Sequence, residues 1–325
     1  MTLSRIRIGT RGSPLALWQA HDVKRRLLEA HPHLAGDDGV DITIIRTSGD
    51  RLQRGPLSEV GGKGLFTKEI EEALLEGSID MAVHSMKDVP TWFPEGLLID
   101  CLLPRADPRD ALIAPNARSI ADLPAGTTVG TASLRRKAML LHKRPELTVV
   151  PLRGNVDTRL GRVTSGEVDA TFLALAGLNR LGRDDVPATP VPVEEMLPAV
   201  CQGIVGVERR GDDDRIAELL VRLNDADASV QAAGERELLA GLDGSCRTPI
   251  AAYGDIDGTD LRFRAAIVRP DGSELLAADR RGPYAPLASP SSRVALRLCG
   301  PSAHVLLAAT ILQRSTHMQQ LTKTW

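Results

Sequence analysis

Basic side chains are concentrated in one stretch of the sequence, residues 131–162. Eight residues there are Lys or Arg and only two are acidic, which gives the stretch a net charge of +6. Arg135 and Arg136 fall in the first turns of a predicted helix, where the helix dipole disfavours cations. This placement predicts an anionic ligand at the helix N-terminus, and a solvated basic face is the alternative. Arg11 holds the corresponding place in the first half of the chain.

A second group of reactive side chains belongs to the sequence VHSMKDVP at residues 83–90. Lys87 and Asp88 stand side by side just after a short apolar strand. A carboxylate at the C-terminal end of a strand and near arginines can transfer protons or stabilise a cationic intermediate. The alternative is an ordinary surface pair of Lys and Asp. His84 is a candidate base or ligand, although a single His beside a core strand is more often structural.

One of the four cysteines stands in a setting that favours a reactive thiolate. Cys246 lies in a polar, Gly-containing loop and is followed by Arg247. The surroundings of Cys101 are typical of core packing, and Cys201 and Cys299 have no charged neighbours. The cysteines show no metal-ligand spacing, so no metal is expected.

A glycine-rich stretch, GGKG at residues 61–64, has the composition of a phosphate loop but not its spacing. We expect Lys63 either to bind a carboxylate or to belong to a mobile flap over a cleft. The sequence contains no GxGxxG, Walker A or HExxH motif.

Two similar series of strands and helices position these residues. The alternation of strand and helix patterns predicts a parallel sheet with right-handed crossovers in each series. Ser13 followed by Pro14 is a strong helix start. The first series comprises strands at 5–8, 40–47 and 79–83, with helices beginning at Ser13–Pro14 and at residue 65. The second comprises strands at 128–130, 147–152 and 170–175, with helices at 131–143 and 156–165.

The domain organisation follows from these series. Proline-bearing stretches at 103–108 and 187–198 are the predicted connections between two α/β domains that face a cleft, and residues 204–208 return as a strand to the first sheet. A helix at 229–239 and antiparallel strands at 250–256, 261–268 and 274–278 predict a smaller C-terminal α+β domain. The predicted domains are residues 1–103 with 204–224, residues 104–203, and residues 225–325.

The composition excludes several classes of protein. Forty Lys and Arg against 42 Asp and Glu give a net charge of −2, and aromatic residues make up 3% of the chain. Neither value favours a nucleic-acid binder. The N-terminus lacks a signal-peptide core, and the longest apolar stretch, residues 303–312, is about half of the ~20 residues that a membrane span needs. We expect a cytoplasmic protein without membrane or nucleic-acid partners, and nothing requires more than a monomer.

Six motifs together resemble one family. They are RGSPLALWQA (11–20), VGGKGLF (60–66), AVHSMKDVP (82–90), GTASLRR (130–136), LRGNVDTRL (152–160) and GLDGSCRTP (241–249). In this order they closely resemble the porphobilinogen deaminase, or hydroxymethylbilane synthase, family. The resemblance runs from residue 3 to about residue 282. It implies two α/β domains like those of periplasmic binding proteins, facing a cleft, and a smaller α+β domain that carries the cofactor cysteine.

The resemblance also implies a reaction and the residues that carry it out. Four molecules of porphobilinogen are joined head to tail on a dipyrromethane cofactor, which Cys246 holds as a thioether, with release of ammonia and hydroxymethylbilane. Asp88 matches the catalytic aspartate, and Lys63 lies in the flap. The cofactor-binding positions are Lys87, Thr131, Ser133, Arg135, Arg136 and Arg159. The substrate-binding positions are Arg11, Ser13, Gln19, Arg153, Arg180 and Gln202.

Arginine suits this role because its planar fork binds a carboxylate through two hydrogen bonds, and every pyrrole unit carries an acetate and a propionate. Replacing Arg135 or Arg153 by Leu is expected to weaken carboxylate binding and to leave the fold intact. Loss of ammonia leaves an electron-poor azafulvene, whose positive charge Asp88 can stabilise.

The sequence departs from the family pattern at three places. Glu59 precedes the glycine-rich stretch where a basic or polar residue is common, and Cys201 stands where a Gly is common. After Gly282 the resemblance stops, and the prolines of residues 283–290 are incompatible with the amphipathic helix that usually ends the family. Residues 283–325 are therefore atypical.

Two alternative functions are also compatible with parts of the sequence. A two-domain anion receptor without chemistry would suit the fold and the arginines, but it would leave Cys246 and the Lys87–Asp88 pair without a role. A nucleic-acid binder would use the basic stretch. The mass of the intact protein discriminates, because only the enzyme carries two pyrrole units on Cys246.

Overall fold

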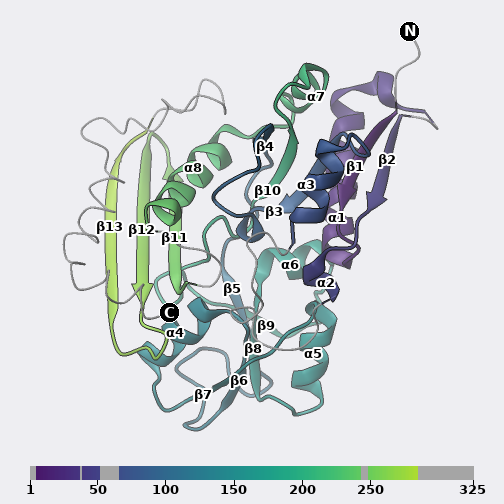
Figure 1. The fold of residues 1–325 in the computed structure, drawn as a ribbon. Helices are drawn as coiled ribbons and strands as arrows, with labels where there is room; N and C mark the ends of the chain where they lie inside the picture. The colour runs from purple at the N-terminus through teal and green to yellow at the C-terminus, as the bar shows by residue number, and fades with distance from the viewer. Residues whose placement is uncertain (1–4, 37–38, 52–65, 243–247, 285–325) are drawn as a thin grey trace.

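The structure is a computed structural model that describes residues 5–36, 39–51, 66–242 and 248–284. Its described part contains two five-stranded sheets and one three-stranded sheet. Figure 1 shows the first sheet in the upper part of the molecule, the second below it, and the three-stranded sheet to one side.

The first sheet is mixed, with strand order β2-β1-β3-β10-β4. Its strands are β1 (Ile6–Thr10), β2 (Val40–Ile44), β3 (Met81–Ser85), β4 (Leu97–Leu102) and β10 (Val205–Arg210). Strand β1 runs parallel to β2 and β3, whereas β10 is antiparallel to both of its neighbours. The predicted parallel arrangement of β1, β2 and β3 is confirmed, and the sheet is mixed because β10 enters it from the other half of the chain rather than through a βαβ crossover.

Four α-helices accompany the first sheet in the described part of the chain, and two of them were predicted. They are α1 (Pro14–Ala30), α2 (Ser48–Arg51), α3 (Lys68–Leu75) and α7 (Asp214–Leu220), with 3₁₀ turns η1 (Pro32–Leu34) and η2 (Met86–Asp88). Ser13 is the N-cap of α1 and accepts a hydrogen bond from the Ala16 amide, as its position before Pro14 predicts. Ile70 and Leu74 of α3 are fully buried and form the inner face of this helix.

The second sheet repeats the plan of the first, with strand order β7-β6-β8-β5-β9. Its strands are β5 (Asp110–Ile113), β6 (Thr128–Gly130), β7 (Thr148–Val150), β8 (Ala170–Ala174) and β9 (Ala188–Pro190). Here β6 is parallel to β7 and β8, and β5 is antiparallel to β8 and β9. This sheet is therefore also mixed, and β5 takes the place that β10 has in the first.

Three helices accompany the second sheet: α4 (Leu134–Lys143), α5 (Val156–Thr164) and α6 (Leu175–Arg180). Helix α4 begins three residues later than predicted, because Ser133 remains extended and caps it by accepting a hydrogen bond from the Arg136 amide. Asn155 caps α5 in the same way through the Thr158 amide.

The chain passes between the two sheets twice. Residues 103–109 link β4 to β5, and residues 191–204 link β9 to β10. The first connection lies where it was predicted. The second begins later than predicted, because residues 188–190 pair with β5 as strand β9. The domain boundaries at 103–104, 203–204 and 224–225 remain predictions.

The third unit consists of helix α8 (Ala226–Gly241) and the antiparallel strands β11 (Ile250–Asp257), β12 (Asp260–Val268) and β13 (Leu275–Pro283). Helix α8 contacts both β11 and β4, so it joins this unit to the first sheet (Figure 1). Val230, Leu238 and Phe263 are buried in the core between them. No helix in the described part of the chain is long and apolar enough to cross a membrane.

Candidate active site

Asp88 lies at the end of a single 3₁₀ turn that directly follows strand β3. The turn is held by its backbone, since the Met86 amide donates to the Ile204 carbonyl at 3.0 Å and the Val89 amide donates to the Met86 carbonyl at 3.2 Å. Asp88 is exposed, and its carboxylate forms no hydrogen bond with any residue that the structure describes. A carboxylate at this point is free to act on a ligand.

Lys87, next to it, points to the junction between the two sheets. Its Nζ donates to Oε1 of Gln202 at 3.4 Å. Burial lowers the pKa of Lys87 to about 8; the charge of Asp88 opposes this shift, and the charges of Arg136 and Arg159 add to it. The structure thus brings Lys87 and Asp88 of the first sheet near two arginines of the second.

The arginines of α4 share one buried carboxylate, Asp110 at the start of β5. Nη2 of Arg135 donates to Oδ2 of Asp110 at 2.6 Å, and Nη2 of Arg136 donates to Oδ1 at 2.7 Å. Nε2 of Gln202 donates to the same Oδ1 at 2.9 Å. Burial by itself would raise the pKa of Asp110, but the two guanidinium charges and these hydrogen bonds outweigh it and hold the pKa well below its usual range.

This arrangement differs from the predicted one. Arg135 and Arg136 were expected to face a ligand, yet both are buried, and they also donate to the carbonyls of Leu197 and Phe172. This burial gives a reason to expect that Arg135→Leu destabilises the fold, because the substitution would leave Asp110 with one buried partner fewer. One donor in the cluster, Nε of Arg135, is buried and has no hydrogen-bond partner among the described residues.

Asp110 is the main site residue that the sequence reasoning missed. A sequence signal was present, because an acidic residue directly precedes the apolar run Ala111, Leu112 and Ile113. A charged residue at the edge of a fully buried strand needs a partner. Without the strand order, however, nothing in the sequence indicates that the partners are Arg135 and Arg136.

Three further predicted residues lie around α4 and α5. The Thr131 side chain is buried and accepts a hydrogen bond from the Ser133 amide at 3.2 Å. Nε of Arg159 donates to the Gly154 carbonyl at 2.9 Å. Burial lowers the pKa of Arg159 to about 10; the charge of Arg136 adds to this shift, and the charge of Asp88 opposes it. Arg153 is partly buried just before α5.

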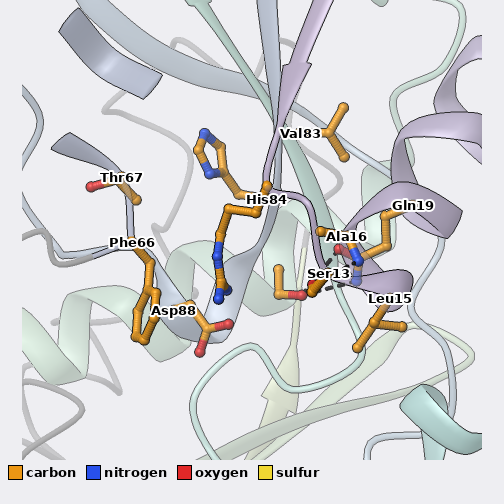
Figure 2. A pocket seen from close by; sticks show the side chains of 11 residues that line it. Ser13, Leu15, Ala16, Gln19, Phe66, Thr67, Val83, His84 and Asp88 are labelled. Atoms are coloured by element: carbon orange, nitrogen blue, oxygen red, sulfur yellow. Dashed lines mark hydrogen bonds between the residues drawn. The ribbon is translucent and has the colours of Figure 1, made fainter. Parts of the chain in front are cut away.

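A cavity of about 70 Å³ lies beside Asp88, and Arg11, Ser13, Gln19 and Phe66 also line it (Figure 2). All residues that line it belong to the first sheet or to its helices and loops.

The polar residues of the cavity wall are held by neighbours. Arg11 donates to the Asp50 carboxylate and stacks over the Phe66 ring, with its guanidinium carbon 4.3 Å from the ring centre. Gln19 and Ser85 hydrogen-bond each other through their side chains, at 2.9 Å. The predicted substrate residues Arg11, Ser13 and Gln19 thus share one cavity with Asp88.

Arg180 lies apart from this cavity, at the contact between the two halves. Its Nη2 donates to the Gly203 carbonyl at 2.7 Å, and its guanidinium carbon is 5.8 Å from the Trp18 ring centre. Burial lowers the pKa of Arg180.

His84 is buried, and its Nε2 lies 3.0 Å from Oε2 of the buried Glu208. Its imidazole points away from Asp88 in Figure 2. The buried Glu71 interacts with the same group, and its pKa is raised by burial and further by repulsion from Glu208. This geometry favours the structural interpretation of His84 over that of a base.

The structure describes two of the cysteines, Cys101 and Cys201. Cys101 is buried in the core, as predicted, and Cys201 is buried as well. Burial raises the pKa of both thiols to about 12. Cys201 adopts a positive φ of 58°, which glycine adopts at lower cost. Cys246 and Lys63 lie outside the described residues. Within the described ranges, no group of three or more His, Cys, Asp or Glu side chains is placed to hold a metal ion.

The solved structures that match this chain at low identity include a substrate-binding domain and a sulphonate-binding protein. The second substrate-binding domain of Lactococcus lactis GlnP in its open conformation matches 73% of this chain and 94% of its own, with 14% identity and a TM-score of 0.42. The aliphatic sulphonate binding protein SsuA of Escherichia coli matches 74% and 71%, with 14% identity and a TM-score of 0.40.

Sequence comparisons identify much closer relatives. Porphobilinogen deaminase of Paracoccus denitrificans is 54% identical over 295 residues, which are 91% of this chain and 94% of the relative. The chloroplastic porphobilinogen deaminase of Oryza sativa is 54% identical over 284 residues, 87% and 79% of the two chains. Porphobilinogen deaminase of Syntrophotalea carbinolica is 46% identical over 309 residues, 95% and 97%.

Two family models match the chain as well. Residues 6–218 match the model "Porphobilinogen deaminase, dipyromethane cofactor binding domain", and residues 230–292 match "Porphobilinogen deaminase, C-terminal domain". The second match continues past Gly282, so the expectation that the resemblance stops there was wrong. With both models matched and half of the residues identical to those of distant relatives, the chain belongs to the porphobilinogen deaminase family.

Proposed function

We propose that this chain is a porphobilinogen deaminase that joins four porphobilinogen molecules head to tail and releases ammonia at each step. Its product is the linear tetrapyrrole hydroxymethylbilane. The observation that carries the proposal is that Lys87 and Asp88 of one sheet lie within electrostatic range of Arg136 and Arg159 of the other, and that Gln202 contacts both Lys87 and the Asp110 carboxylate that binds Arg136. A simple anion receptor has no use for an unpaired, exposed carboxylate among these cations.

The donor set fits a dipyrromethane cofactor, whose two rings carry four carboxylates. Burial lowers the pKa values of Lys87 and Arg159, and neither forms an ion pair within the described part of the chain. Nε of Arg135 is a buried donor without a partner there. Buried cations and donors of this kind are stabilised when carboxylates pair with them. Thr131 and Ser133 line the same helix start, and Cys246 would hold the group as a thioether.

Bound dipyrromethane supplies the pyrrole terminus to which substrate units are added. Asp88 acts on the incoming substrate. When the carbon–nitrogen bond of its aminomethyl group breaks, the electron pair leaves with nitrogen and the methylene carbon becomes electron-poor. The Asp88 carboxylate stabilises that positive charge electrostatically. The ring carbon that attacks this methylene would come from the terminal pyrrole of the bound cofactor. Asp88 would accept the proton that the ring carbon then loses and release it to solvent, while the nitrogen has already left from its protonated form as ammonia.

The remaining site residues bind and orient the substrate. We assign its carboxylates to Arg11 and Arg153, and its polar contacts to Ser13 and Gln19. Arg180 and Gln202 lie near the connections between the sheets, where they orient the growing chain. Lys63 belongs to the flap over the site. The enzyme works as a monomer in the cytoplasm.

The test combines the mass of the intact protein with an assay of porphobilinogen consumption. The proposal predicts a mass that exceeds the chain by two pyrrole units, and ammonia release in step with consumption of porphobilinogen. Cys246→Ala is the matched control and should carry no added mass. A protein that carries no pyrrole units, and still binds porphobilinogen without releasing ammonia after incubation with it, would be a receptor instead.

A further inference from the structure

The backbone just after Asp88 is held by a side chain from another unit of the protein. Nη1 of Arg236, on helix α8, donates to the Val89 carbonyl at 3.1 Å, and its Nη2 donates to the Pro90 carbonyl at 2.5 Å. These carbonyls belong to the residues that directly follow Asp88. A single guanidinium therefore fixes the outgoing end of the turn that presents the carboxylate.

Arg236 has no carboxylate within salt-bridge distance in the described ranges, so its hydrogen bonds to backbone carbonyls are its main polar contacts there. Its guanidinium also lies over the Phe93 ring, 5.2 Å from the ring centre, and burial lowers its pKa. Placing a charge in such surroundings is costly when no acid balances it. The fork geometry of arginine, which spans two successive carbonyls, gives a reason for its presence.

Helix α8 is itself anchored where the two sheets are connected. Glu235, the neighbour of Arg236, accepts hydrogen bonds from Arg105 at 2.6 Å, from the Cys201 amide at 2.5 Å and from the Gly254 amide at 2.8 Å. The helix therefore has a fixed position relative to both connections and to β11. It ends at Gly241, shortly before Cys246 in the sequence.

From these contacts we infer that Arg236 is a positioning residue for Asp88. Through Arg236, the position of helix α8, which leads to the cofactor cysteine, sets the position of the turn that carries the Asp88 carboxylate. The Asp88 carboxylate forms no hydrogen bond in the described part of the chain, so its aim depends on the backbone of residues 86–90. This inference rests on the proposed function, because it needs Asp88 to act in the reaction.

The experiment compares holoenzyme variants in steady-state assays with porphobilinogen. Arg236→Gln removes the fork, and Arg236→Lys keeps the charge but offers a single ammonium group. The control is Arg209→Gln, because Arg209 likewise donates to two successive carbonyls, those of Arg210 and Gly211, away from the site. Arg209 also pairs with Asp100, so this control removes an ion pair that Arg236 lacks in the described ranges. Melting temperature and the mass of the loaded protein are measured for each variant.

For Arg236→Gln we expect kcat to fall at least tenfold, KM to stay within about threefold, and the cofactor to be loaded normally. Arg236→Lys should recover part of kcat, and Arg209→Gln should keep kcat within about twofold even if it melts earlier. If Arg236→Gln does not fold, Arg236→Lys decides, and a lowered kcat at an unchanged melting temperature supports the inference.

Three results would overturn it. The first is a wild-type kcat in folded Arg236→Gln or, where that variant does not fold, in Arg236→Lys. The second is an equal loss of kcat in Arg209→Gln. The third is a change in the Arg236 variants that is confined to KM. A wild-type chain without any turnover would instead overturn the proposed function, and the inference with it. An active wild type together with an unaffected Arg236 variant overturns the inference alone.

Discussion

Asp110→Asn tests how the two arginines of α4 are held. The substitution keeps the shape of the side chain and removes its charge, so Arg135 and Arg136 lose the carboxylate to which both donate. Asp110 is fully buried, and the two arginines are nearly so. Removing one partner of a buried ion pair costs about 3–5 kcal/mol. We expect the free energy of unfolding at pH 7 to fall by this amount.

Urea unfolding followed by circular dichroism measures the loss. With a slope of about 2 kcal/mol per molar urea, the midpoint should fall by roughly 1.5–2.5 M. Asp279→Asn is the control, because its ion pair with Arg262 is about half exposed and such pairs contribute about 0–1 kcal/mol.

The dependence on pH gives a second readout. The folded pKa of Asp110 lies below its ordinary value of 3.8. A depressed folded pKa stabilises the protein above the unfolded pKa, and this contribution is lost as the pH falls through the folded value. The difference between wild type and Asp110→Asn should therefore be constant from pH 7 to about pH 5 and shrink in stronger acid. A loss at pH 7 no larger than that of Asp279→Asn would refute the reasoning.

Cys246→Ser should give a folded protein that lacks the cofactor mass and is nearly inactive, since a hydroxyl is a poorer nucleophile than a thiolate; normal mass and turnover would place the anchor elsewhere. Asp88→Asn should load the cofactor and lose about 10²–10⁴ in kcat, while Asp88→Glu keeps some activity; equal rates of the two variants would show that the charge is not needed. Arg153→Leu should weaken substrate binding at unchanged stability, which KM and the melting temperature check. Because burial lowers the pKa of Lys87 to about 8 in the cofactor-free protein, its charge is lost there as the pH rises through 8, so loading of the cofactor should weaken above pH 8; in Lys87→Arg, which stays charged, this weakening should vanish.

Much of the fold follows from local signals in the sequence. Ser13, Ser133 and Asn155 cap their helices because a side-chain oxygen before a helix satisfies one of the free amides of its first turn. Such a contact joins residues three positions apart, so a short stretch of sequence is enough to predict it. The antiparallel strands β11, β12 and β13 follow one another in the chain, so each pairs with a near neighbour in sequence. The predicted positions of β11 and β12 are confirmed, whereas β13 continues to Pro283, beyond its predicted end at residue 278.

Strands β4, β5 and β9 and helices α2, α6 and α7 were not predicted. Strand β5 has four residues, all buried, and a run this short has no period that distinguishes strand from loop. Its partners β8 and β9 lie far away in sequence. The antiparallel direction of β5 and β10 depends on where each strand enters its sheet, which the local sequence does not indicate.

The sequence alone determined which residues could do chemistry. Lys87 with Asp88, the arginines of residues 131–162 and Cys246 are recognisable because their types and neighbours are local properties. Only the tertiary structure decided which of them meet. Asp110 lies between Arg135, Arg136 and Gln202 because the antiparallel insertion of β5 brings its first residue to the start of α4. Ion pairs and hydrogen bonds act over a few ångströms, whereas these partners are separated by 25 to 92 residues, so the strand order selects the pairs.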